Sequence, residues 1–309
     1  MTAYIIRRLL WLPVILMAVA FITLLLGLYG PGDPAQVLLG QRSNPDVVAR
    51  VRALWGLDQP FHVQYGKYLW NLVHLDFGES LRYRGDSIAG LIFPKIWVSV
   101  QLALVAIALS LGVGIPIGIL AAFKRMTWID TAAIGFTLLG ISIPVFVLGP
   151  VLQLLFVRTL HLLPTSGWEG IWSVKILMPA FVLGFGAIAG IARQTRVSVL
   201  SVMDQEYVRV AQSKGLRGRT IMFRHILKNA LIPIFTLVGF MLADLPAGAL
   251  ITEMIFGIPG IGPFAFDAIF SRDYPVIMAT TLVVACSYVV MNLLVDIGYT
   301  FLDPRIRYD

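Results

Sequence analysis

Few residues of this 309-residue chain could perform chemistry, because ionisable side chains are rare within its apolar stretches. Asp244 interrupts an otherwise uncharged run near its middle, and Glu253 and Asp296 lie near the ends of such runs. An acid inside a membrane span is expected to be functional or paired. Asp244 could attract the amino terminus of a substrate, or it could hold helices together through a hydrogen bond. For Glu253 and Asp296 we expect interfacial solvation or a partner, with Glu253 a second candidate for lining a polar path across the membrane.

The chain carries no constellation typical of an enzyme. Its four histidines are scattered without the His-Glu-x-x-His spacing of a zinc site. No Gly-x-x-x-x-Gly-Lys-Ser/Thr loop is present to cradle the phosphates of ATP. A membrane-embedded hydrolase would need a nucleophile with a base, or a set of metal ligands. We therefore expect a non-catalytic chain with no metal site and no bound cofactor.

The composition is that of an integral membrane protein. Hydrophobic residues make up 58% of the chain and charged residues only 13%, where soluble domains contain about a quarter. The net charge of +7 does not indicate nucleic-acid binding, because the basic residues lie mostly beside apolar runs, where cytoplasmic loops and anionic lipid favour them. We expect membrane lipid, and no nucleic acid, around this chain.

Runs without charge predict an all-α fold with six transmembrane helices. The predicted spans are Leu9–Gly32, Ile96–Phe123, Thr131–Val157, Ile176–Ala192, Asn229–Thr252 and Tyr274–Val295. Short loops on the side of the termini carry most of the Lys and Arg, which predicts that both termini are cytoplasmic. The expected location is a cell membrane, crossed several times.

This division gives four segments. They are 1–32 with the first span, an extracytoplasmic helical segment over 33–95, a five-helix transmembrane core over 96–303, and a cytoplasmic tail over 304–309. In the outer segment, Asn44 followed by Pro45 predicts a helix start, and Gly56 predicts its end. We expect a small helical cap whose apolar faces pack on the spans.

Residues 193–228 form a basic loop between two predicted spans, with eight Lys or Arg against two acids. Asp204 is the expected N-cap of a helix over 205–214, with Glu206 in its first turn. Gly215 is expected at the C′ position that ends it. A second helix should begin near Arg219 and run into the fifth span, because Phe223, Ile226, Leu227 and Ala230 recur on one helical stripe. The loop predicts a docking element for a soluble partner, although lipid headgroups could also explain some of its charges.

The outer loop 255–263 alternates apolar residues with Gly and Pro. Its candidate residues are Phe256, Pro259, Gly260 and Gly262. Gly and Pro at this density prevent a regular helix, and irregular backbone at membrane depth lines a cavity or is buried in protein. The loop could be an outer gate, a re-entrant turn, or a tight turn between spans.

The basic loop resembles the cytoplasmic loop of binding-protein-dependent ABC importer permeases, and most closely the dipeptide/oligopeptide/nickel branch. The resembling stretches are Glu206-Tyr207-Val208-Arg209-Val210-Ala211-Gln212-Ser213-Lys214-Gly215-Leu216 and Arg224-His225-Ile226-Leu227-Lys228-Asn229-Ala230-Leu231-Ile232-Pro233. Further similar segments, such as Phe77-Gly78-Glu79-Ser80 and Leu163-Pro164-Thr165-Ser166-Gly167, run along the whole chain. The long outer segment suggests the first permease of a pair.

The resemblance implies a heterodimer of two permeases, two ATPase subunits that bind ATP and Mg, and an extracytoplasmic solute-binding protein. The ATPase-coupling residues would be Asp204, Glu206, Tyr207, Arg209, Val210, Ala211, Lys214, Gly215 and Leu216. The expected cargo is a di- or oligopeptide, with nickel or another small solute as the alternative within the family. A stand-alone secondary transporter, which usually shows paired intramembrane charges and an internal repeat, is the alternative of another class.

Overall fold

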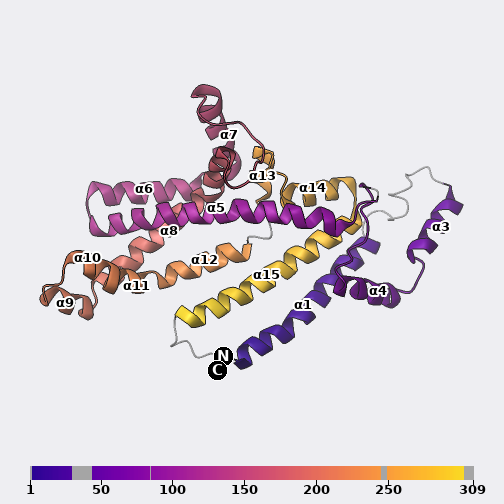
Figure 1. Cartoon of the computed structure of the whole chain (residues 1–309), viewed down its shortest axis with the longest axis horizontal. Coiled ribbons are helices and arrows are strands. Elements are labelled where there is room, and N and C mark those ends of the chain that lie inside the picture. Colours follow the sequence, from indigo (N-terminus) through magenta and orange to yellow (C-terminus); the bar gives the residue numbers. More distant parts are fainter. Residues whose placement is uncertain (1, 30–43, 84, 245–248, 303–309) are drawn as a thin grey trace.

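The computed structural model describes residues 2–29, 44–83, 85–244 and 249–302, and within these ranges every named element is a helix (Figure 1). Four helices are long and apolar enough to cross a membrane. They are α1 (Thr2–Tyr29), α5 (Ile88–Phe123), α8 (Leu177–Met203) and α15 (Tyr274–Leu302). The predicted class, an all-α membrane protein, is confirmed.

Three further groups of helices could each form one bent span, with angles of 105°, 49° and 93° at their breaks. The first joins α6 (Trp128–Ser142) to α7 (Val145–Leu152) and the π-helix η1 (Gln153–Thr159). The second joins α10 (Gly218–Thr220), the π-helix η3 (Ile221–Ile226) and α11 (Leu227–Ala230) to α12 (Ile232–Asp244). The third joins α13 (Leu250–Phe256) to α14 (Ile261–Ser271). The described residues thus hold four to seven candidate spans, and six stays a prediction.

The third predicted span, 131–157, is wrong as a single helix. α6 ends at Ser142, and Ile143 and Pro144 have extended backbone with ψ of 114° and 144°. Pro144 lacks an N–H, and its ring disfavours helical backbone at the residue before it. Figure 1 shows α7 rising steeply away from α5 and α6. An uncharged run indicates that a segment is apolar, but it does not predict this change of direction between α6 and α7.

α5 and α8 form the central helix pair, and glycines let their backbones approach closely. A Cβ at Gly118 would lie only 2.4 Å from the carbonyl oxygen of Ala192. Ser110 donates a hydrogen bond across the pair to the carbonyl of Gly184, at 3.2 Å. The short 3-10 helix η2 (Val174–Ile176) leads into α8. At about 1.5 Å per residue, α5 is about 54 Å long, so it can join distant parts of the molecule.

α5 begins earlier than the sequence predicted. Its first residue is Ile88, eight residues before the predicted start at Ile96, and Ser87 caps it by accepting from the N–H of Gly90. The predicted span begins only after Lys95, because it was defined as a run without charge. That ammonium lies over the ring of Phe264, 4.9 Å from its centroid, so the helix continues through it.

The outer segment contains α3 (Pro45–Trp55) and α4 (Phe61–Val73). Asn44 accepts a hydrogen bond from the N–H of Asp46, and Gly56 ends α3 in the left-handed conformation, with φ of 67°. Both helix boundaries confirm the prediction. α4 packs on α1 through edge-to-face contacts between aromatic rings, which is the structural role expected of its apolar stripe.

Candidate functional site

The basic segment after α8 carries a short helix, α9 (Glu206–Ser213), at one end of the long axis (Figure 1). Val208 and Ala211 are its buried residues, and they pack in one apolar cluster with Ala122 of α5 and Val199 of α8. The apolar side of α9 therefore rests on the ends of the two central helices. Its other side chains point outward.

The end of α9 is a Schellman motif built on Gly215, as the sequence predicted. The backbone of Gly215 is left-handed, with φ of 71°. Its N–H donates to the carbonyl of Gln212 at 2.9 Å, and the N–H of Leu216 donates to the carbonyl of Ala211 at 3.4 Å. A side chain would be strained at this φ, and glycine is free of that strain.

The predicted N-cap of α9 at Asp204 is wrong. α8 continues to Met203, and Asp204 keeps helical backbone, with φ of −83° and ψ of −3°. An N-cap needs extended backbone, and the first residue that has it is Gln205, with ψ of 146°. Because α8 extends this far, 193–203 belong to a helix and the connecting loop begins at Asp204.

Tyr207 fixes α9 against the helix that follows. Its hydroxyl accepts a hydrogen bond from the side-chain amide of Asn229 at 2.7 Å and donates to the carbonyl of His225 at 3.3 Å. Asn229 also donates to that carbonyl, at 3.2 Å. With the apolar cluster below, these bonds hold α9 in one orientation.

The second helix of the loop departs from its predicted stripe of Phe223, Ile226, Leu227 and Ala230. Ile226 and Ala230 are buried, whereas Phe223 is 65% exposed. The cause is η3, a π-helix, whose wider i→i+5 turn shifts the register that a 3.6-residue period assumes. An apolar ring is thus presented outward beside α9.

The exposed side chains of this segment are here called the docking surface. They are Glu206, Tyr207, Arg209, Val210, Lys214, Leu216, Arg217, Arg219 and Phe223. Apolar and basic groups alternate on it, and no ion pair joins these side chains to other described residues. Such a surface suits an acidic or mixed protein surface with apolar pockets.

The turn between α13 and α14 is the second candidate site, and it centres on a buried acid. Glu253 has no exposed surface. One carboxyl oxygen accepts from the hydroxyl of Ser99 at 2.6 Å and from the N–H of Ala249 at 3.3 Å, and the other accepts from the N–H of Gly262 at 3.0 Å. Ser99 in turn accepts from the N–H of Ile261 at 2.9 Å. This side chain bridges α5, α13 and α14.

Two glycines let the turn close around that carboxyl group. A Cβ at Gly260 would lie 2.4 Å from the carboxyl carbon of Glu253, and a Cβ at Gly262 would lie 2.7 Å from the Cα of Leu250. Both glycines are therefore needed for close approach. Gly257, with φ of 61°, ends α13 in the left-handed conformation.

The other predicted gate residues divide by burial. Phe256 is buried, and its carbonyl accepts from the N–H of Gly167 at 2.8 Å, whereas Pro259 is exposed. α13 and α14 have 7 and 11 residues and meet at 93°. Helices this short do not cross a bilayer core of about 30 Å. The loop is thus a broken span or a re-entrant segment, and a tight turn between two complete spans is excluded for these residues.

Asp244 is the last residue of α12, but its side chain lies outside the described residues, as does that of Asp296. The role of Asp244 therefore stays a prediction. Of the two expectations for Glu253, interfacial solvation or a partner, the structure shows partners. This residue is a fully bonded internal acid, because the turn wraps around it.

The sequence interpretation missed an ion pair near the docking surface. Arg196 of α8 donates to both carboxylate oxygens of Asp130 in α6, at 2.5 and 2.9 Å, and the N–H of Met126 donates to the same carboxylate at 3.0 Å. The position of Asp130 in the first turn of a helix was a usable signal. Its partner, 66 residues away, had no signal in one sequence.

It also missed the acid that joins the outer segment to the core. Asp273 precedes α15 and is buried. It accepts from the hydroxyl of Ser80 at 2.5 Å and from the N–H groups of Leu81 and Arg82 at 3.2 Å each. An Asp two residues before Pro275 is a typical helix start, so the cap was predictable and the distant partners were not.

Known proteins resemble this chain along its whole length. Residues 114–308 match the family described as binding-protein-dependent transport system inner membrane component, and residues 1–82 match the description of the N-terminal part of such components. A peptide transport system permease protein of Brucella abortus is 39% identical over 315 residues. A dipeptide transport system permease protein of Alkalihalophilus pseudofirmus and a glutathione transport system permease protein of Salmonella paratyphi A are each 36% identical, over 336 and 311 residues. All three alignments cover 100% of both chains.

A solved structure shares the fold. The methionine ABC transporter MetNI in an inward-facing conformation contains a chain that aligns with a TM-score of 0.54 at 17% identity, over 70% of this chain and 97% of that chain. The match of the family over most of the sequence, together with relatives of equal length, settles the classification. The chain belongs to the binding-protein-dependent transport system inner membrane components, and it is a permease subunit of an ABC importer.

Proposed function

We propose that this permease imports di- or oligopeptides, and that its docking surface enters a groove of an ATPase subunit. The relatives of full length that are named for peptides, dipeptides and glutathione, itself a peptide, support this cargo. The complete assembly would contain a second permease, two ATPase subunits that bind ATP and Mg, and an extracytoplasmic binding protein. The chain itself would bind neither ATP nor a metal.

The observation that carries the ATPase contact is the construction of the docking surface. The apolar side of α9 is buried, yet Val210 and Phe223 remain 52% and 65% exposed among basic side chains. A short helix with both its outward apolar and basic groups unpaired is suited to a partner that covers the first and pairs the second. In this proposal the coupling residues and both termini lie on the cytoplasmic side.

α5 would carry the motion away from that contact. Ala122, near its end, packs in one cluster with Val208 of α9, and Ser99, the twelfth of its 36 residues, hydrogen-bonds Glu253. These two positions are 23 residues apart, about 35 Å along the helix axis. Movement of the docking surface can thus reach the α13–α14 turn, which would be the outer gate, through one continuous helix.

A direct test uses the reconstituted complex with a charged residue at the centre of the docking surface. Val210→Asp should lower ATP-driven peptide uptake at least tenfold while the thermal stability of the permease stays unchanged, because the side chain is exposed. Val73→Asp is the matched control, since Val73 is an even more exposed valine on α4. Equal uptake by the two variants would contradict the docking role.

The alternative cargo, nickel or another small solute, differs in its binding protein. Purified cognate binding protein should bind a tripeptide in calorimetry and should not bind nickel at the same concentration. Nickel binding with no peptide binding would transfer the proposal to the alternative.

A further inference from the structure

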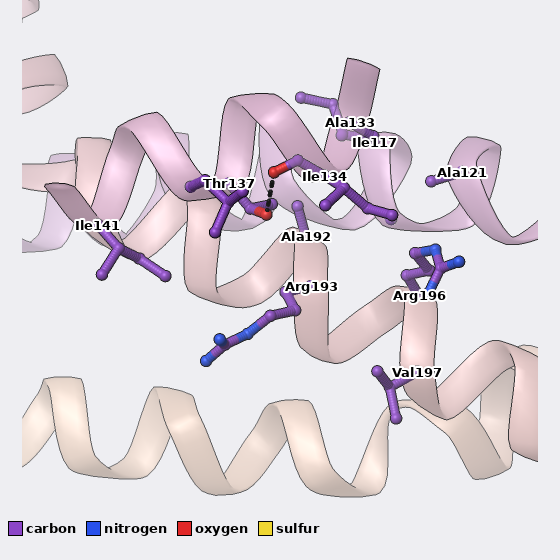
Figure 2. Close-up of a pocket in the computed structure, with 12 residues that line it drawn as sticks. Ile117, Ala121, Ala133, Ile134, Thr137, Ile141, Ala192, Arg193, Arg196 and Val197 are labelled. Carbon is purple, nitrogen blue, oxygen red and sulfur yellow. Dashed lines mark hydrogen bonds between the residues drawn. The ribbon is translucent and has the colours of Figure 1, made fainter. Parts of the chain in front are cut away.

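A cavity of about 280 Å³ lies between α5, α6 and α8 (Figure 2). Small residues from all three helices create the space, namely Gly118, Ala121, Ala133 and Ala192. The rest of the lining is mainly apolar, with Ile134 and Val197 among it. Its volume is near the lower limit of sites that bind small molecules.

Two arginines of α8 line this cavity, and only one is neutralised. Arg196 makes the two-bond ion pair with Asp130 described above. Thr137 uses its hydroxyl to donate to the carbonyl of Ile134, at 2.8 Å. Arg193 is exposed and has no hydrogen bond or ion pair with another described residue. The described lining therefore carries one uncompensated positive charge.

The position of Arg193 makes that charge costly without a partner. It lies in the apolar helix α8, ten residues before the last residue, Met203, or about 15 Å from that end. Charged groups inside a candidate span occur mostly where they are paired or face a polar pathway. Figure 2 shows the guanidinium extending away from Arg196.

The direction of the side chain favours a solute over a lipid headgroup. The ion pair of Arg196 with Asp130 lies next to exposed Trp128, a residue type that marks membrane interfaces. A side chain that served a lipid phosphate would extend toward that interface. The guanidinium of Arg193, a residue of the cavity lining, instead extends away from Arg196.

We propose that Arg193 binds the terminal carboxylate of the transported peptide in this cavity. The inference rests on the proposed peptide cargo. A guanidinium presents two parallel N–H donors that match the two oxygens of a carboxylate. The small residues of the cavity leave room for the side chain of the peptide's C-terminal residue. The mainly apolar walls place little restriction on the type of that side chain. Arg193 would thus select for a free carboxylate rather than for a sequence.

The test compares two probes, trialanine and trialanine amide, in proteoliposomes that hold the complete complex and its binding protein. Arg193→Gln should lower uptake of trialanine at least tenfold and change uptake of the amide less than twofold. The binding protein is the same for the wild-type and variant complexes, so its own preference cancels in the ratio of variant to wild type. Arg193→Lys should keep an intermediate preference, and Arg158→Gln, an exposed arginine of η1 outside the cavity, should change neither rate.

The remaining outcomes separate the sources of failure. Equal loss for both probes would overturn the inference, because a structural role does not discriminate between them. A loss that appears only in liposomes with anionic phosphatidylglycerol would also overturn it in favour of a lipid. Wild-type complex that imports neither probe would refute the peptide cargo, and the inference with it. If Arg193→Gln does not assemble, Ala133→Leu should fill the cavity and slow trialanine uptake with Arg193 intact, and unchanged uptake would contradict the site.

Discussion

The docking surface packs on one end of α5, and the α13–α14 turn contacts the same helix about 35 Å away, at Ser99. The two regions use their polar groups in opposite ways. On the docking surface Arg209, Lys214 and Arg217 point outward without partners among the described residues. In the turn, both oxygens of Glu253 accept hydrogen bonds and the side chain is inaccessible. One region offers its charges to another molecule, and the other uses a charge-bearing group to fix its own backbone.

The difference teaches where substitutions should affect folding and where they should affect function alone. A buried acid with three donors leaves unsatisfied groups when it is changed. An exposed arginine is solvated, so its removal leaves no buried group unsatisfied. Removal of a group from the turn should thus lower the stability of the permease. Removal of a group from the docking surface should lower the coupling of ATP hydrolysis to uptake.

The largest effect is expected from Gly260→Ala in the turn. The new Cβ would lie 2.4 Å from the carboxyl carbon of Glu253, so the acid must leave its donors. We expect a loss of about 3 kcal/mol or more in stability, because several buried donors lose their acceptor. Thermal unfolding of the purified permease measures it. Gly112→Ala in α5 is the control, since nothing lies within 4 Å of its Cβ, and equal melting temperatures would refute the packing argument.

Glu253→Gln should have a smaller effect on the same turn. The three partners of this side chain, Ser99, Ala249 and Gly262, all donate hydrogen bonds to it. The NH₂ group of glutamine is itself a donor, so it must face at least one of them without forming a bond. One unmade bond should cost about 1–3 kcal/mol. Combining it with Ser99→Ala tests the coupling, because the two changes share one bond and should be less than additive. Strict additivity would show that this bond does not hold the turn.

Gly215→Ala should separate the two regions most clearly. The change places a side chain at φ of 71° with no atom within 4 Å, so the strain is about 1–2 kcal/mol and local. We expect a small change in stability but a clear fall in peptide uptake per ATP hydrolysed. Gly78→Ala carries the same backbone strain, at φ of 79°, in the outer segment. If both variants lose uptake equally, strain alone explains the result.

The smallest effect is expected at Glu169, in the loop before α8. Its pKa lies below the ordinary value because it accepts hydrogen bonds from Lys175 and Ser173. A lowered pKa stabilises the fold above the ordinary pKa of Glu, and this contribution disappears as the pH falls through the lowered value. Glu169 is exposed and Lys175 is only half-buried, so Glu169→Gln should melt almost like the wild type at neutral pH, and the two curves should converge in acid. A large gap at pH 7 would contradict a surface role.

The sequence predicted the elements that follow from local chemistry. Gly215 ends α9 and Asn44 begins α3 because a left-handed glycine and a capping amide act within a few residues. The N-cap prediction at Asp204 was wrong because the length of α8 depends on its packing against α5, which no local pattern shows. The prediction that Phe223 lies on the apolar stripe was wrong because a π-helix changes the period on which that stripe depended.

The site was predictable only in part for a similar reason. Glu253 and Gly260 were both candidates, but their contact depends on the fold of the turn. Ser99 contributes from 154 residues away, and its type and position in an apolar run gave no warning. Residues that act through local geometry could be found in one sequence, whereas pairs distant in the chain required the structure.

Cross-linking tests the central claim, that the docking surface contacts an ATPase, most directly. The chain has a single cysteine, Cys286, so Cys286→Ser gives a background for one introduced thiol. Val210→Cys on the docking surface should form a cross-link to an ATPase subunit in the complete complex, with a yield that changes when ATP binds. Val73→Cys on α4 should form none. Absence of an ATPase cross-link at Val210, in a complex that still imports peptide, would contradict the account.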